Sequence, residues 1–223
     1  MRQLLLAIFV LLTSLIAVST AQADPLCQSS GYCVYESPGF KITVVDRETG
    51  QPLADVHALA EWVQQALYGT SGPLMVQDAV SGPDGLLTFP AWGPIEGSTS
   101  GLVLGQDPVI TLFTPGYSTM VVNNARGSDG KASVRGFARD EQTFKLDPFK
   151  GSPEEWLEQL KQVGVGRANR ITDEQRLQFR DAYLNRLRRV SSERSKLPER
   201  FQSQGEFFWF VDGLMKFLEE GRW

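Results

Sequence analysis

The sequence predicts a mainly β protein with an α-helical C-terminal extension: an antiparallel β-sandwich of about seven strands followed by about three helices. Two observations lead to this fold class. Between Phe40 and Phe149, apolar and polar residues alternate in short runs separated by Gly, Pro, Asn and Asp. After Pro148 the apolar residues recur at helical spacing instead. We therefore expect a sandwich over residues 40–149 and helices over residues 150–223.

The first residues form a pattern typical of a cleavable signal peptide. Arg2 supplies one positive charge, residues 4–18 are mostly apolar, and Ala21-Gln22-Ala23 matches a cleavage site. We expect cleavage before Asp24 and export to the periplasm or out of the cell. A retained membrane anchor is the alternative, although polar residues interrupt the stretch before it reaches the roughly 20 residues that a span needs. No later segment is long and apolar enough to span a bilayer.

The only two cysteines, Cys27 and Cys33, lie soon after the predicted cleavage site. In an oxidising compartment they should form a disulfide, so residues 24–39 are predicted to be a stapled N-terminal segment. Closing so short a loop would stabilise the fold by about 2 kcal/mol. A redox pair or a zinc site is the alternative. Redox pairs favour two intervening residues, and structural zinc needs four ligands, whereas the chain has a single histidine.

The strands of the sandwich can be placed from alternation and turn residues. The first covers Phe40–Asp46 and is followed by turn chemistry over Arg47–Leu53. The second covers Asp55–Trp62, with Val56, Ala58, Ala60 and Trp62 on one face and His57, Leu59 and Glu61 on the other. Further strands are expected over Leu74–Val80, Gly85–Phe89, Val109–Phe113, Ser118–Val122 and Gln142–Leu146.

Three motifs in this region carry a family resemblance. Ile42-Thr43-Val44-Val45-Asp46, followed by Thr49-Gly50-Gln51-Pro52-Leu53-Ala54-Asp55-Val56, resembles the opening of carboxypeptidase regulatory-like domains. Asp84-Gly85-Leu86-Leu87-Thr88-Phe89-Pro90 and Pro115-Gly116-Tyr117 resemble two later turns of that family. The resemblance implies a prealbumin-like (transthyretin-like, Ig-like) sandwich that serves as a noncatalytic folding or interaction module.

One stretch departs from the family. Residues Ala91 to Pro108 form a longer connection than these domains usually have. It is interpreted either as a functional loop or as a tolerated insertion.

The enzymes that share this type of sandwich set requirements that the sequence does not meet. Hydroxyisourate hydrolases use several histidines and end in Tyr-Arg-Gly-Ser, and intradiol dioxygenases bind iron through two tyrosines and two histidines. This chain has one histidine and ends in Glu220-Gly221-Arg222-Trp223. His57 has no nucleophile nearby in the sequence and is interpreted as an ordinary surface or interface residue. We therefore expect no catalytic residues, no cofactor and no metal site, and a protein that is not an enzyme.

Two helix starts are marked by capping residues. Ser152 is a predicted N-cap with Pro153 at the first helical position. Thr172 and Gln175 form a predicted capping box for a second helix. The apolar stripe of that second helix consists of Phe179, Tyr183, Leu184, Leu187 and Val190.

The two halves of the mature chain differ in charge. Residues 24–149 are net acidic and residues 150–204 are net basic. The basic tail could dock on the acidic sandwich, face an anionic membrane or nucleic acid, or simply be solvated. Nucleic acid is disfavoured by export, by the acidic overall charge and by the lack of a known binding motif.

The last segment is apolar around most of a helix, although Asp212, Gly213 and Lys216 interrupt it. Such a helix needs burial on more than one side. We expect it to pack on the sandwich, near outward-facing residues such as Leu59, and between the other helices. Any part left exposed would mark a site for a partner or for peripheral contact with a membrane. The candidate interaction surface is Phe207, Phe208, Trp209, Phe210, Met215 and Phe217.

These observations lead to one main functional hypothesis and two alternatives. The main hypothesis is an exported, noncatalytic accessory protein of the periplasm or cell envelope that binds an envelope protein. The first alternative is a carbohydrate-binding module that presents Trp92 and Tyr117 on loops. The second is an unrecognised hydrolase that uses carboxylates such as Asp84 or Asp129.

Overall fold

The computed structural model describes residues 32–66, 69–98, 108–124, 137–163, 168, 171–202 and 206–221. The predicted signal peptide, Cys27 and Asp129 lie outside these ranges, so the expected cleavage and the expected disulfide stay predictions. Within the described ranges no helix is long and apolar enough to cross a membrane.

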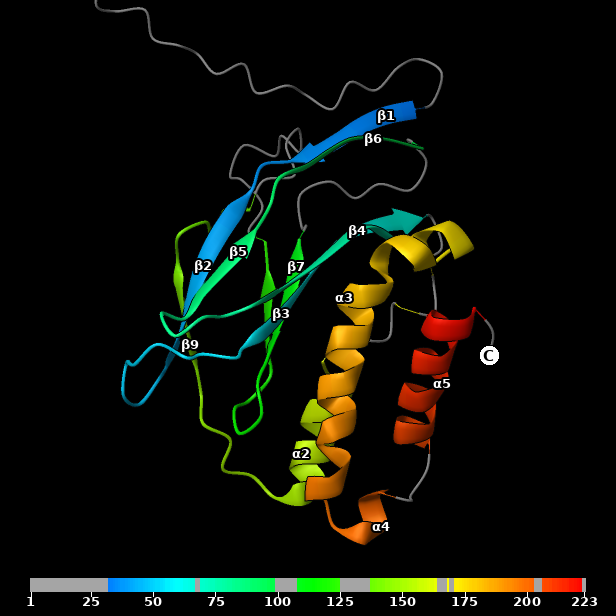
Figure 1. Cartoon of the computed structure of the whole chain (residues 1–223). Helices are drawn as coiled ribbons and strands as arrows, with labels where there is room; N and C mark the ends of the chain where they lie inside the picture. The colour runs from blue at the N-terminus through cyan, green and yellow to red at the C-terminus, as the bar shows by residue number, and fades with distance from the viewer. Residues whose placement is uncertain are drawn as a thin grey trace, which may run out of the picture.

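The predicted fold class is confirmed: strands form the first part of the chain and helices the last (Figure 1). The described residues contain nine strands in three sheets. One sheet pairs β1 (Tyr32–Ser37) with β6 (Trp92–Ser98). A second has the order β5 (Leu86–Phe89), β2 (Phe40–Asp46), β9 (Thr143–Leu146), and the third has the order β4 (Gly69–Val80), β3 (His57–Ala66), β7 (Val109–Phe113), β8 (Met120–Asn123).

All the strand pairs are antiparallel except β2 with β9, which run parallel with Thr43 opposite Thr143. A purely antiparallel sandwich was expected, so this pair is a difference in detail. A parallel pair needs a long crossover between its strands. The rest of the sandwich supplies that crossover, because β3 to β8 lie between β2 and β9 in the chain.

Strands β1 and β6 were not expected from the sequence. They belong to the predicted N-terminal segment and to the predicted insertion, and they pair with each other from Tyr32 opposite Ser98 to Ser37 opposite Trp92. Figure 1 shows this ribbon leading on from β2 and β5. The part of the insertion that the structure describes is therefore largely a strand.

The interior between the sheets is aromatic and aliphatic. Trp62 is fully buried, and its ring meets that of Trp92 edge to face at a centroid distance of 5.4 Å. Phe40 stacks on Phe89 at 4.7 Å. The predicted faces of β3 are confirmed, because Ala58, Ala60 and Trp62 point into this core, whereas Leu59 belongs to a second core beneath the helices.

Two turns of the sandwich are joined by a side-chain hydrogen bond. Asp46 Oδ1 accepts from the backbone amides of Glu48 and Thr49 at 2.8 and 2.7 Å, which closes the turn after β2. Its Oδ2 accepts from the hydroxyl of Tyr117, in the Pro-Gly-Tyr turn, at 2.9 Å. These hydrogen bonds, that from Thr49 first, hold the pKa of Asp46 below its ordinary value.

The helices begin where the capping residues predicted. The described α-helices are α2 (Pro153–Lys161), α3 (Asp173–Ser192), α4 (Glu199–Gln202) and α5 (Glu206–Glu220), and the short 3-10 helix η2 covers Arg194–Lys196. Ser152 with Glu155 and Thr172 with Gln175 both form complete capping boxes. Each box satisfies amides that a helix start leaves unpaired.

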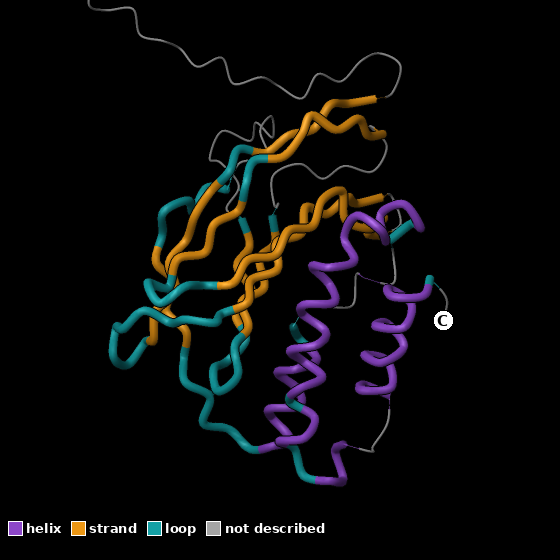
Figure 2. Tube along the Cα trace, in the orientation of Figure 1, coloured by secondary structure: helices purple, strands orange, loops and turns teal. Residues whose placement is uncertain are grey.

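The helices form a layer on the outer face of the sheet that contains β3 (Figure 2). Helix α3 lies between this sheet and α5 (Figure 1). Its predicted stripe, from Phe179 to Val190, is buried together with Leu59 and Phe113 of the sheet. Helix α5 was expected on the sandwich and between the other helices. It packs chiefly on the helix α3, because α3 already covers the outward face of β3.

Candidate functional site: the sandwich–helix interface and the outer helix

Two regions outside the sandwich core combine polar or exposed aromatic side chains. One is the outer face of α5, which the sequence singled out. The other is a polar cluster at the interface between β3 and α3, which the sequence did not indicate. The second region centres on His57, Asp78 and Arg186.

The predicted aromatic surface of α5 divides into three kinds of position. Phe208 is buried in the helical core, and the guanidinium of Arg194 lies 4.6 Å from the centre of its ring. Trp209 is 75% exposed. The other four side chains, Phe207, Phe210, Met215 and Phe217, are half-buried against the same core.

The division has a geometric cause. The apolar arc of α5 is wider than the single face that α3 covers, so successive residues point toward α3 and away from it. Phe208 is therefore part of the architecture, and Trp209 is the large apolar group of α5 that is mostly in contact with solvent.

His57 lies at the interface, fully buried beneath α3. Its Nδ1 accepts a hydrogen bond from Arg186 Nε at 2.8 Å, so the ring proton is on Nε2, which donates to Asp78 Oδ2 at 3.1 Å. Asn185 Nδ2 donates to the same carboxylate oxygen at 3.0 Å. Both ring nitrogens of His57 are therefore engaged within the chain.

The electrostatics of the cluster keep His57 neutral. Burial is the largest cause that lowers the pKa of His57, to about 4; the hydrogen bond to Asp78 opposes this, and the charge of Arg186 reinforces it. At neutral pH the ring therefore carries one proton.

Arg186 is a fully buried cation. Besides His57 Nδ1, it donates to the carbonyl oxygens of Val163, His57 and Thr111 at 2.8, 3.0 and 2.7 Å. Burial lowers its pKa to about 9, and the nearby charge of Glu61 partly offsets this, so Arg186 stays protonated at neutral pH. Glu61, also buried, accepts from the Tyr183 hydroxyl at 2.8 Å.

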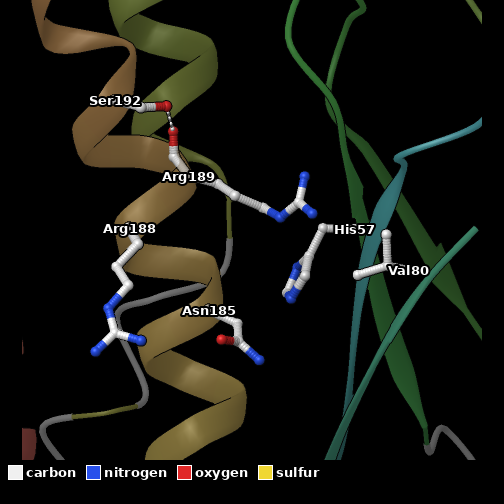
Figure 3. Close-up of a pocket in the computed structure, with 6 residues that line it drawn as sticks. All are labelled: His57, Val80, Asn185, Arg188, Arg189 and Ser192. Atoms are coloured by element: carbon white, nitrogen blue, oxygen red, sulfur yellow. Dashed lines mark hydrogen bonds between the residues drawn. The ribbon is translucent and has the colours of Figure 1, made fainter.

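Above this cluster lies an open groove of about 500 Å³, lined by His57, Val80, Asn185, Arg188, Arg189 and Ser192 (Figure 3). Its arginines already have acidic partners. Arg189 reaches across toward β3 and pairs with Asp55 at 2.7 Å, and Arg188 pairs with Glu219 at 3.3 Å. An incoming anion would have to displace these carboxylates.

Several charged residues that cause the charge asymmetry between the two halves of the chain form ion pairs within the protein. Arg189 with Asp55 and Lys150 with Glu48 join the basic tail to the acidic sandwich. Arg194 with Asp212 and Arg200 with Glu154 pair within the tail. The basic tail is thus partly docked on the sandwich and partly neutralised by its own acids.

Three of the residues considered for the alternative functions are described, and each occupies a structural position. Trp92, expected on a loop, is only 8% exposed because β6 turns its ring inward onto Trp62. The Tyr117 hydroxyl is bonded to Asp46. Asp84 Oδ1 accepts from the amide of Leu86 at 3.1 Å and so closes the turn before β5. Among the described residues, no group of three or more His, Cys, Asp or Glu side chains is arranged to hold a metal ion.

Comparison of the sequence with protein-family models and with curated proteins returns no match. Comparison of the fold with solved structures returns distant matches. The 3-chlorocatechol 1,2-dioxygenase of Rhodococcus opacus 1CP is 14% identical, with a TM-score of 0.32 over 52% of this chain and 61% of that one. This chain therefore spans less than two thirds of that enzyme.

Two further matches are similar in kind. The dioxygenase domain of a dioxygenase carbohydrate-binding protein fusion from Streptomyces sp. SirexAA-E is 19% identical, with a TM-score of 0.28 over 54% of this chain and 82% of that one. The group B streptococcus pilus 2b backbone protein is 11% identical, with a TM-score of 0.23 over 57% of this chain and 53% of that one. At these scores the matches assign no activity to this chain, and the β-sandwich is described from its own strands.

The matches correct one expectation from the sequence. We expected a protein that is not an enzyme, but two of these three structures are dioxygenases. The expectation is corrected: a sandwich architecture can carry both enzymes and structural proteins, so the lack of a catalytic motif in the sequence does not show that the protein is not an enzyme.

Proposed function

We propose that this chain is an exported protein of the periplasm or cell envelope that acts by binding another envelope protein, with the outer face of α5 around Trp209 as the contact. Two observations support the proposal. The N-terminal residues have the pattern of a signal peptide. The outermost helix carries a tryptophan that is 75% exposed.

The exposure of Trp209 is the observation that carries the proposal. Burying a tryptophan removes about 150–250 Å² from water, so leaving three quarters of it exposed forgoes about 3 kcal/mol of stabilisation. Tryptophan is also enriched among the residues that dominate binding energy at protein interfaces. Leu177 on α3 is comparably exposed, at 66%, and provides a matched control.

For the sandwich we propose the carboxypeptidase regulatory-like type. The hydrogen bond between Asp46 and Tyr117 supports this, because it joins the first and last of the three motifs. The second motif also has a geometric role. Gly85 has a φ of +72°, and a Cβ there would collide with the carbonyl oxygen of Val44, so this Asp-Gly turn requires glycine.

The proposed contact can be tested by photo-crosslinking in intact cells. A photo-reactive amino acid at position 216, exposed on the same side of α5 as Trp209, should form an adduct with a discrete envelope protein. The same group at Gln178, exposed on α3, should not. Trp209→Ala should reduce the adduct by about tenfold, whereas Leu177→Ala should leave it unchanged.

Other outcomes would redirect or reject the proposal. No adduct at position 216, or an adduct that Trp209→Ala does not reduce, would reject the α5 contact. Binding of purified protein to a glycan array that is lost in Trp209→Ala would favour the carbohydrate-binding alternative. Binding to anionic vesicles that is lost in the same variant would favour peripheral membrane contact.

A further inference from the structure

Helix α3 is tied to the sandwich through the buried guanidinium of Arg186. Its hydrogen bonds reach the backbone carbonyls of His57 in β3 and Thr111 in β7, and also that of Val163, just after α2. One side chain of α3 therefore connects two neighbouring strands of the sheet with the segment that follows another helix. These three acceptors are carbonyl oxygens and do not titrate.

The remaining acceptor of Arg186 can titrate. Arg186 Nε donates to His57 Nδ1 at 2.8 Å, and a ring nitrogen accepts a hydrogen bond only while it carries no proton. Because Nε2 already holds the proton that it shares with Asp78, a second proton must go to Nδ1. There it would point at the N–H of the guanidinium.

The charged groups around His57 come from every element packed against it. Arg186 and Arg189 of α3 disfavour a charged imidazole, and Asp78 of β4 favours one. Asp55, before β3, pairs with Arg189, and Glu61 lies on the same face of β3 as His57. Thr111 of β7 contributes its backbone carbonyl to Arg186. Burial and the two arginines outweigh Asp78, which keeps the pKa of His57 near 4.

We propose that the contact between His57 and Arg186 is an acid-sensitive latch between the sandwich and its helical tail. When Nδ1 gains a proton it stops accepting from Arg186, and two cations then face each other inside the interface. This repulsion opposes the carbonyl bonds of Arg186 and the apolar contacts that remain, and so weakens the attachment of α3, with α5 packed on it, to β3. The apolar core between the sheets contains neither group and stays folded at the pH where the latch opens.

This latch does not depend on the proposed binding function and can be tested separately. The full exported chain is titrated from pH 7 to about pH 3 by NMR. Because His57 is the only histidine, its imidazole signals need no assignment. Amide hydrogen exchange, corrected for its intrinsic pH dependence, is followed in the same samples.

The expected result is one shared midpoint near pH 4 for two signals: protonation of the His57 ring and loss of amide protection in α3 and α5. The amides of β2 and β9 should stay protected at that pH. If α3 and β2 lose protection together, the acid transition is global unfolding and the latch is rejected. A gap of more than about one pH unit between the ring midpoint and the α3 midpoint also rejects it.

Two variants separate a latch from an ordinary buried histidine. Asp78→Asn removes the anion that favours the charged ring, so both midpoints should fall by about one pH unit. His57→Asn keeps an oxygen that can accept from Arg186 but gains no charge, so α3 should stay protected to lower pH than in the wild type. Release of α3 at the wild-type pH in His57→Asn would overturn the proposal. If neither variant folds at pH 7, the wild-type midpoints decide the question.

Discussion

The two faces of strand β3 belong to two different kinds of interior. The face that carries Ala58, Ala60 and Trp62 looks into a core of aromatic and aliphatic side chains between the sheets. The face that carries His57, Leu59 and Glu61 is equally buried, but there polar side chains form hydrogen bonds with α3. Tyr183 donates to Glu61, and Arg186 donates to His57. The first interior depends on packing, and the second depends on packing together with a specific set of hydrogen bonds.

The difference teaches how the helical tail is positioned. Apolar contacts are tolerant of small shifts, because their strength follows buried area rather than direction. The bonds of Arg186 and Tyr183 are directional, and a buried group left without its partner is costly. Helix α3 is therefore held at one register on the sheet, whereas the sandwich core needs only complementary shapes.

The largest expected effect comes from opening the apolar core. Trp62 is fully buried and touches the rings of Phe40 and Trp92. Trp62→Ala should lower the free energy of unfolding by about 4 kcal/mol, because it leaves a cavity between the sheets. Denaturant unfolding measured by circular dichroism checks this. A loss under 1 kcal/mol would mean that the core collapses around the vacant volume.

A slightly smaller effect is expected from the polar interior. Arg186→Met keeps an apolar stem of similar length but leaves three carbonyls and His57 Nδ1 without their donor. It should cost about 3 kcal/mol in the same unfolding experiment. Arg188→Met, on the exposed side of the same helix, should cost less than about 1 kcal/mol. Equal costs for the two variants would show that the buried hydrogen bonds of Arg186 add no measurable stability.

The polar interior should also make stability depend on pH. The pKa of His57 is about 4 when folded, below its ordinary value of 6.5, so between these values the unfolded chain binds a proton that the folded chain does not. The contribution of His57 to the free energy of unfolding is therefore complete above pH 6.5. It falls by about 3 kcal/mol in total as pH drops toward 4. Unfolding free energies measured across this range check the sign. In His57→Asn this part of the slope should disappear.

The smallest effects are expected from substitutions at two glycines of the sandwich that both have a positive φ. Gly85 has a φ of +72° and Gly50 of +71°, but a Cβ at Gly85 meets the Val44 carbonyl, whereas nothing lies within 4 Å at Gly50. Gly50→Ala should cost about 1 kcal/mol for the backbone alone. Gly85→Ala should cost about 2 kcal/mol, because the clash adds to it. Thermal unfolding of both variants measures the difference.

The strands predicted from alternation were mostly found, with shifted ends. Strand β7 has the predicted bounds, Val109–Phe113. Strand β3 begins two residues later than expected and continues to Ala66. Strand β6 was missed because it contains Gly93, Pro94 and Gly97. Strand β1 was missed because it is stabilised by pairing with β6, which is distant in the sequence. The same pairing placed Trp92 inside, where a loop had been expected.

The candidate sites were predicted less completely than the fold. The aromatic run of α5 was visible in the sequence, but the separation of buried Phe208 from exposed Trp209 depends on which side of α5 faces α3. The cluster at His57 gave no local signal, because its partners Asp78 and Arg186 lie 21 and 129 residues away. Spacing within one element can reveal a face but not the distant residue that meets it.

The sequence by itself determined the local structure: alternating strands, glycine turns, capped helices and the apolar stripe of α3. These features depend on interactions between residues that are near one another in the chain. Only the tertiary structure decided that β1 pairs with β6, that α5 lies on α3 rather than on the sheet, and that Arg186 is buried against His57. The reason is physical: each of these depends on the free energy of contacts between distant segments, which local pattern does not encode.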